Sequence, residues 1–119
     1  QICRPEKYRT LSVMKTLVGT LEEFEISTQK SLEIGQAYVL VLRSISGFWA
    51  IEDRCSHDDN ELLGGEITEN QGAAPSIKCV RHGARFNLEN GKALCLPAVK
   101  AVKSYRAWCE DNLVWVEAN

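Results

Sequence analysis

Short runs of β-branched and aromatic residues, separated by turn-forming residues, recur along much of this 119-residue chain. Residues 38–43 and 48–51 form the clearest pair, and the serine and glycine residues between them are typical of a hairpin turn. Further runs of this kind occupy residues 76–80, 84–88, 102–109 and 113–117, with turn-forming residues at 89–91 and 110–112. Strands this short and this closely spaced predict an antiparallel β-sandwich or barrel.

Other parts of the chain carry weaker signals. Residues 53–65 and the polar segment 66–75 do not alternate as a strand does, so we expect loops in both. Thr20 followed by Glu23 is a capping-box pattern, which predicts a single helical turn over residues 21–24. Neither a repeat nor a low-complexity run divides the chain, so a single domain is expected.

Composition and charge restrict the class of protein. The chain is 45% hydrophobic and 25% charged, which is ordinary for one soluble globular domain. Fourteen Lys and Arg residues against 16 Asp and Glu residues give a net charge of −2, so a nucleic-acid partner is not expected. The apolar runs are far shorter than the roughly 20 residues that a bilayer-spanning helix needs, which argues against a membrane partner.

Met14 begins a segment that reads like a natural start. We therefore expect residues 1–13 to be an N-terminal extension and residues 14–119 to be the functional domain. The five cysteines are an odd number, and no charged segment followed by an apolar one marks a secretory leader. Free thiols of this kind suit the reducing cytoplasm better than a secreted disulfide framework would.

The only two histidines each stand close to a cysteine, in the pairs Cys55 with His57 and Cys79 with His82. Each pair lies at the end of a predicted strand and enters a loop. Two such loops side by side on a sheet could offer two thiolates and two imidazoles to one metal centre. Taken singly, these residues are more often buried thiols and surface imidazoles, but two mirrored pairs that use both histidines favour the metal site.

The order of the ligands separates two kinds of metal site. Structural zinc sites usually repeat one residue type within a pair, whereas each pair here mixes a cysteine with a histidine. Mixed pairs suit a 2Fe-2S cluster of the Rieske type, in which one iron takes two thiolates and the other takes two imidazoles. Each loop then gives one ligand to each iron. A zinc-stabilised binding module is the alternative from another class.

The residues around the two pairs extend this pattern. In order and local spacing, the chain resembles Rieske-type ferredoxins from about residue 16 to residue 119. The matching segments are Cys55-Ser56-His57, Leu62, Gly64-Gly65, Cys79-Val80-Arg81-His82-Gly83-Ala84-Arg85-Phe86, Asn90-Gly91 and Leu96-Pro97-Ala98. The resemblance implies an all-β Rieske fold, an antiparallel β-sandwich with a small cluster-binding subdomain formed by the two ligand loops.

The resemblance also implies the cofactor, which is one 2Fe-2S cluster per chain. Cys55 and Cys79 would bind one iron through sulfur, and His57 and His82 would bind the other through imidazole nitrogen. In the family a third loop covers the cluster, and Pro97 takes the place of the proline in that loop.

Several positions depart from the high-potential members of the family. Those members carry two further cysteines that form a disulfide, where this chain has Asn60 and Arg81. They also carry serine and tyrosine hydroxyls near the cluster, where this chain has Ala84 and Phe86. These differences imply a low-potential ferredoxin of the oxygenase-associated type.

Other residues stand outside the ligand pattern. Twenty-one residues separate His57 from Cys79, more than is usual in the family, and we expect the excess in residues 68–76. Cys109 falls in a predicted strand and is expected to be a buried packing residue. Cys95 is expected near the cluster without binding it.

The resemblance implies a one-electron carrier and not an enzyme, since the sequence offers no second set of acid, base or nucleophile. Such a carrier passes electrons from a flavin-containing NAD(P)H reductase to a terminal oxygenase. The alternative is a small Rieske subunit or accessory of another redox enzyme, of the nitrite reductase or iron-sulfur assembly type. Docking through the cluster end would use the charges that flank the two histidines, namely Asp58, Asp59, Glu61, Lys78, Arg81 and Arg85.

Overall fold

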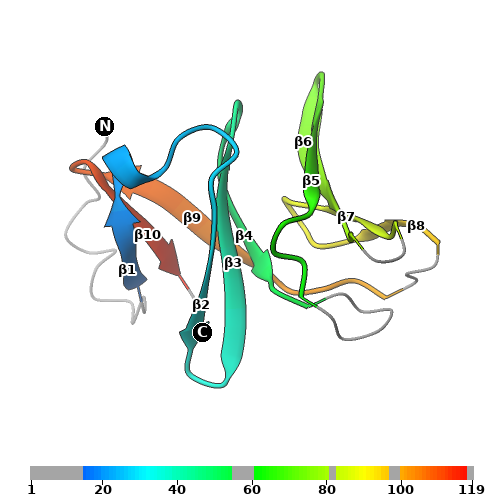
Figure 1. The fold of residues 1–119 in the computed structure, drawn as a ribbon, viewed down its shortest axis with the longest axis horizontal. Helices are drawn as coiled ribbons and strands as arrows, with labels where there is room; N and C mark the ends of the chain where they lie inside the picture. Colours follow the sequence, from blue (N-terminus) through cyan, green and yellow to red (C-terminus); the bar gives the residue numbers. More distant parts are fainter. Residues whose placement is uncertain (1–14, 55–60, 81–82, 97–99, 118–119) are drawn as a thin grey trace, which may run out of the picture.

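The computed structural model describes residues 15–54, 61–80, 83–96 and 100–117. In this part of the chain, ten strands form two sheets, and neighbouring strands are antiparallel (Figure 1). The strands are β1 (Lys15–Thr20), β2 (Gln29–Ile34), β3 (Ala37–Ser44), β4 (Gly47–Glu52), β5 (Glu66–Asn70), β6 (Ala73–Lys78), β7 (Arg85–Asn87), β8 (Ala93–Cys95), β9 (Ser104–Glu110) and β10 (Leu113–Glu117). The predicted all-β class is confirmed. Within these residues, no helix has the length and apolar character needed to cross a membrane.

The larger sheet has the strand order β1-β10-β9-β4-β3-β2 and curls around a core. Val18 on β1, Val116 on β10 and Val41 on β3 belong to one buried cluster, although β3 is not next to β1 or β10 in the sheet. Side chains from both halves of the sheet meet because the sheet bends back on itself, as Figure 1 shows. We call this cluster the curled core.

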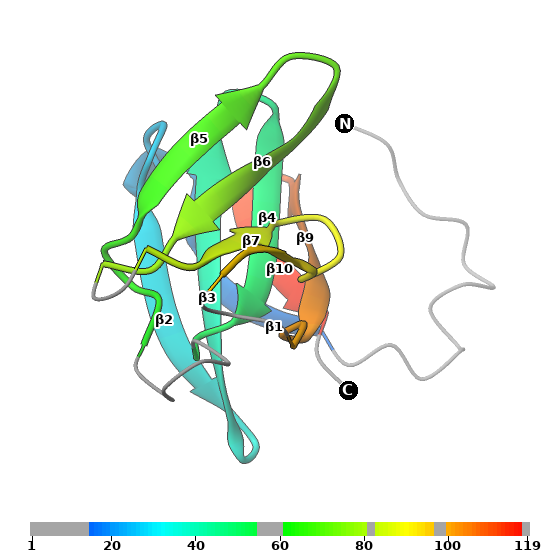
Figure 2. The same cartoon turned by 90° about the vertical axis from the view of Figure 1, so that its right-hand side faces the viewer.

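Strands β3 and β4 are covered on both faces. Val39 and Val41 face the curled core, whereas Leu40 and Leu42 face a second buried cluster that includes Ile77 from the smaller sheet. Burial on both faces explains why β3 is an unbroken apolar run instead of an alternating one. The smaller sheet, with the order β5-β6-β7-β8, packs across the β3–β4 pair and makes the second cluster, which we call the shared core (Figure 2).

Two local features that the sequence predicts are confirmed. The turn between β9 and β10 holds Asp111 and Asn112 at φ values of 55° and 63°, the left-handed conformation of a type I′ hairpin turn. Aspartate and asparagine tolerate this conformation better than most residues do. A single 3-10 turn covers Leu21–Glu23, and the backbone N–H of Thr20 donates to the Glu23 carboxylate at 3.3 Å, as a capping box requires.

The expectation of a loop over residues 66–75 is wrong. These residues form most of the β5–β6 hairpin, so the long segment between the two Cys/His pairs extends the smaller sheet. Pro75 hides this strand in the sequence, because proline lacks the backbone N–H that a central strand uses. A β-bulge between Thr68 and Asn70 shifts the register beside Pro75, which is the kind of place where a sheet accepts proline.

Strand β2 has no clear signal in the sequence because it is a polar strand at a sheet edge. Its residues are half-buried or exposed, and it pairs with β3 from Gln29 opposite Leu42 to Ile34 opposite Ala37. The strand conformation of β2 therefore depends on its backbone pairing with the apolar strand β3. The polar side chains at its first end lie against the segment that carries the predicted metal ligands, as described next.

Candidate metal centre

Cys79 is the predicted ligand that falls among the described residues, and it lies directly after β6. Its side chain is fully buried in the shared core. Its backbone N–H donates to the carbonyl of Ala84 at 2.7 Å, and its carbonyl accepts the N–H of Gly83 at 3.0 Å. Gly83 adopts a φ of 79°, which glycine reaches without strain. The second ligand loop is therefore a tight connection from β6 to β7, and His82 belongs to it in sequence but lies outside the described residues.

The first predicted ligand loop leaves β4 at Asp53 and returns at Leu62. The Oδ1 atom of Asp53 accepts the backbone N–H groups of Leu62 and Leu63, at 2.7 and 3.0 Å. The two ends of this loop are therefore held together. Cys55 and His57 lie between these ends in the sequence, outside the residues that the structure describes.

The described ends of the two loops are neighbours. Leu62, at the returning end of the first loop, is fully buried and belongs to the shared core together with Cys79. Gly65 lies against the end of β6, where a Cβ atom would overlap the carbonyl oxygen of Lys78. Glycine at this position lets the first loop return directly beside the start of the second one.

The residues around Cys79 fit a metal centre of the predicted type. Cys79 is a free thiol, and the apolar shared core shields its sulfur from water. Two thiols and two imidazoles are the donor set of a Rieske cluster, and three of these four donors, Cys55, His57 and His82, fall outside the described residues. Within the described ranges, no three His, Cys, Asp or Glu side chains gather into a metal-binding group.

The remaining cysteines lie apart from this donor set. Cys95, on β8, is exposed, and its thiol donates to the carbonyl of Gly83 across 3.5 Å. It is thus beside the second ligand loop, as expected, and it links that loop to the segment that leads to Pro97, itself outside the described residues. The sequence predicts that Cys109, on β9, is a buried packing residue. It is only half-buried, because its face of the sheet is only partly covered.

Basic and exposed apolar side chains surround the second loop. Lys78 and Arg85 are direct cross-strand partners on β6 and β7, and Nη1 of Arg85 donates to the Thr68 hydroxyl at 3.0 Å. Val80, in the loop itself, is 64% exposed, and Leu96 is 75% exposed. Exposed apolar side chains grouped beside charged ones are typical of interaction surfaces.

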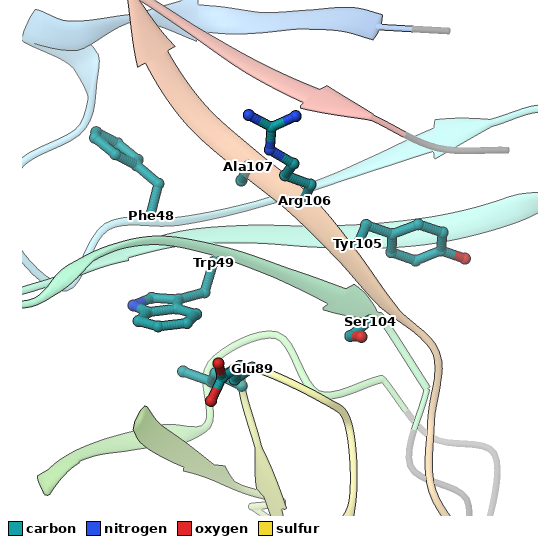
Figure 3. A pocket seen from close by; sticks show the side chains of 8 residues that line it. Phe48, Trp49, Glu89, Ser104, Tyr105, Arg106 and Ala107 are labelled. Atoms are coloured by element: carbon teal, nitrogen blue, oxygen red, sulfur yellow. The ribbon is translucent and has the colours of Figure 1, made fainter. Parts of the chain in front are cut away.

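A shallow groove of about 360 Å³ lies elsewhere, where β4 and β9 diverge (Figure 3). Trp49, Glu89 and Arg106 are among its lining residues. Burial raises the pKa of the Tyr105 phenol at the side of the groove, and the carboxylate of Glu52 adds to the rise, so this phenol stays protonated at neutral pH. The residues that line the groove include neither a thiol nor an imidazole, so the groove contributes no ligand to the predicted metal centre.

Known proteins resemble the chain in sequence. The profile of the Rieske 2Fe-2S domain family matches residues 14–106. The 3-phenylpropionate/cinnamic acid dioxygenase ferredoxin subunit of Escherichia coli strain K12 is 31% identical over 94 residues, which make up 78% of this chain and 85% of that protein.

Known structures share the fold. In a complex of reduced oxygenase and oxidised ferredoxin of carbazole 1,9a-dioxygenase, the matched chain has a TM-score of 0.76 at 23% identity, over 87% of this chain and 92% of that chain. A protein from Mycobacterium tuberculosis assigned as the small subunit of an NADH-dependent nitrite reductase has a TM-score of 0.80 at 15% identity, over 90% and 96% of the two chains. With its Cys79 loop, its two sheets and a family match over residues 14–106, this chain belongs to the Rieske 2Fe-2S domain family, as a ferredoxin of the electron-carrying type.

Proposed function

We propose that Cys55 and Cys79 bind one iron of the Rieske cluster and that His57 and His82 bind the other. The observation that carries this proposal is the buried thiol of Cys79 beside the returning end of the first ligand loop. When bound, the cluster takes up and releases one electron at a time. The chain's own residues hold the loops together, keep water from the Cys79 sulfur and leave the outer side of the second loop exposed.

We propose further that the electron comes from a flavin-containing NAD(P)H reductase and goes to a terminal oxygenase, in the cytoplasm. The similarity to a dioxygenase ferredoxin subunit, over 85% of that protein's length, supports this setting. The surface that would meet these partners is the exposed side of the second loop, with Val80, Leu96, Lys78 and Arg85. Contacts of carriers with their partners are small and short-lived, and apolar residues with a charged surround suit them.

A second candidate is a small Rieske subunit or accessory of another redox enzyme. The fold likeness to the protein assigned as a nitrite reductase small subunit, with a TM-score of 0.80, favours this candidate. The same four ligands would serve it, so the two candidates differ in the partner and not in the site. To separate the two candidates, the rate of electron transfer to an aromatic-ring oxygenase is compared with the rate of transfer to the large subunit of a nitrite reductase. The faster acceptor identifies the partner class.

Metal and sulfide analysis tests the cofactor against the zinc-stabilised module. The purified protein should be red-brown, with about two irons and about two acid-labile sulfides per chain, and after reduction it should give the electron paramagnetic resonance signal of a Rieske cluster. A colourless protein that holds a single zinc would exclude the electron carrier. We expect the functional domain, residues 14–119, to hold the cluster without residues 1–13.

Replacement of a ligand tests the assignment of individual residues. His82→Ala should abolish the Rieske signal, because both imidazoles complete the coordination of one iron. Cys109→Ser is the matched control, since this thiol lies on β9 and outside the proposed site. A cluster that survives in the His82 variant and disappears in the Cys109 variant would overturn the assignment.

A further inference from the structure

Asp53 is a buried carboxylate at the point where the first ligand loop leaves β4. Its side chain is only 7% exposed. Its Oδ1 atom accepts the N–H groups of Leu62 and Leu63, and its Oδ2 atom accepts the hydroxyl of Ser31 at 2.6 Å. Both oxygens therefore have donors, which is the condition under which a buried carboxylate is tolerated.

These hydrogen bonds join three separate segments of the chain. Asp53 precedes the loop, Leu62 and Leu63 follow it, and Ser31 belongs to the edge strand β2. The backbone N–H of Asp53 also donates to the carbonyl of Tyr38 at 2.8 Å, which fixes the start of the loop to β3. The carboxylate thus ties the two described ends of this loop together and fastens them to the larger sheet.

A second polar contact from β2 supports the same loop end. The side-chain amide of Gln29 donates to the carbonyl of Gly65 and accepts the N–H of Gly64, both at 2.8 Å. Gly65 in turn lies against the carbonyl of Lys78, the residue before Cys79. The polar strand β2 therefore sets where the first ligand loop meets the second.

We propose that Asp53 is a positioning residue for the metal centre, which holds the two ends of the first ligand loop together beside Cys79 and so supports the segment that carries Cys55 and His57 in the sequence. This inference rests on the ligand assignment under Proposed function. Because donors from the protein occupy both carboxylate oxygens, Asp53 acts through the loop backbone and not as a ligand. Ser31 orients the carboxylate from the β2 side.

The test measures two quantities, the rate at which the cluster is lost and the resonance g-values of the reduced cluster. Asp53→Ala removes all three acceptor contacts, so the visible absorbance of the cluster should disappear roughly tenfold to a hundredfold faster in the presence of an iron chelator. Asp53→Asn keeps one oxygen for the two N–H groups and should show a smaller acceleration. Ser31→Ala should also accelerate the loss, and the resonance g-values of the reduced cluster should shift or broaden in the Asp53 variants.

Glu110→Gln is the matched control. Glu110 is a carboxylate of the same exposure, 7%, at the end of β9, where it accepts the indole N–H of Trp108. This variant should lower stability without a change in g-values or in the rate of cluster loss. If Asp53→Ala fails to fold, Asp53→Asn and Ser31→Ala decide the question.

Two negative results have different meanings. If the Asp53 and Ser31 variants lose the cluster within about twofold of the wild-type rate and keep its g-values, the positioning role is wrong while the ligand assignment stands. The same conclusion follows if Glu110→Gln accelerates the loss equally. If the wild-type protein itself shows no Rieske signal, the ligand assignment fails, and this inference fails with it.

Discussion

A serine in place of Ala84 should raise the reduction potential of the metal centre. Ala84 is fully buried, and its carbonyl accepts the backbone N–H of Cys79 at 2.7 Å, so the two residues face each other across the second ligand loop. Both side chains belong to the shared core. A hydroxyl on residue 84 would therefore enter the apolar cluster that also holds the Cys79 side chain, whose sulfur is the acceptor we expect it to reach.

The size of the effect follows from the charge that reduction adds. Reduction gives the cluster one further negative charge, so a hydrogen-bond donor stabilises the reduced state more than the oxidised state. If a charge-assisted bond in this buried site is worth on the order of 1 to 2 kcal/mol more to the reduced state, the potential rises by roughly 40 to 90 mV. We expect the unmodified protein to start from the low end of the Rieske range, roughly −150 mV, because Ala84 and Phe86 stand where high-potential members carry hydroxyls.

Protein-film voltammetry at pH 7 measures this shift. Ala50→Ser is the matched control, because Ala50 is also a fully buried alanine but lies in the curled core. The control should lose stability and keep its potential. A shift below about 10 mV in an Ala84→Ser protein with an intact cluster would refute the reasoning, and so would a wild-type potential above about +100 mV, which lies in the upper part of the Rieske range.

Phe86→Tyr restores the second hydroxyl that high-potential members of the family carry near the cluster. Phe86 is fully buried two residues after Ala84, so its ring enters the same shared core. A tyrosine hydroxyl that reaches a cluster sulfur should raise the potential by a similar amount, and this is the outcome we expect. A hydroxyl left without a partner would instead lower the free energy of unfolding by about 1 to 3 kcal/mol, without a change in potential. Voltammetry and urea unfolding of the same sample separate the two results, and the second would contradict the prediction.

Two further predictions concern docking and the fold. Lysine in place of both Asp58 and Asp59 should change the association rate with a natural redox partner several-fold at low ionic strength and leave the potential nearly unchanged, because charges act mainly on encounter. Identical electron-transfer kinetics across a salt series would contradict this. Gly91→Ala should lower the free energy of unfolding by at least about 2 kcal/mol, because Gly91 has a φ of 76° and a Cβ atom there would overlap a backbone carbonyl. An unchanged urea midpoint would show that the chain relaxes at this turn.

The elements that could be predicted from the sequence are those whose own residues carry the signal, either as apolar runs or as turn-forming residues. The β3–β4 hairpin combines apolar runs with a turn, and the β9–β10 turn has Asp111 and Asn112 in the conformation that these residues favour. The position of Cys79 near the end of a strand follows from the same reasoning: the predicted strand 76–80 contains it, and β6 ends at the residue before it, Lys78.

The elements that could not be predicted depend on contacts with distant residues. Strand β2 is polar and gains its order from pairing with β3. The β5–β6 hairpin is hidden by Pro75, which the sheet accepts beside a bulge. The role of Asp53 is also invisible in the sequence, because its hydroxyl partner Ser31 lies 22 positions away and on a strand that is itself unrecognised.

The β3–β4 pair explains why a carrier of this size can keep its metal site in place. Leu40, Leu42 and Ile51 lie beneath Leu62 and Cys79, while the opposite face of the same two strands is covered by the curled core. A closely packed interior yields little when a charge changes nearby, so we expect the inner side of the proposed site to resist rearrangement when the cluster is reduced. The exposed side chain of Val80 in the second ligand loop lies on the outer side, where the proposed partners would dock. If the proposed ligands and docking surface are correct, a fixed site and a replaceable partner lie on opposite sides of one short loop.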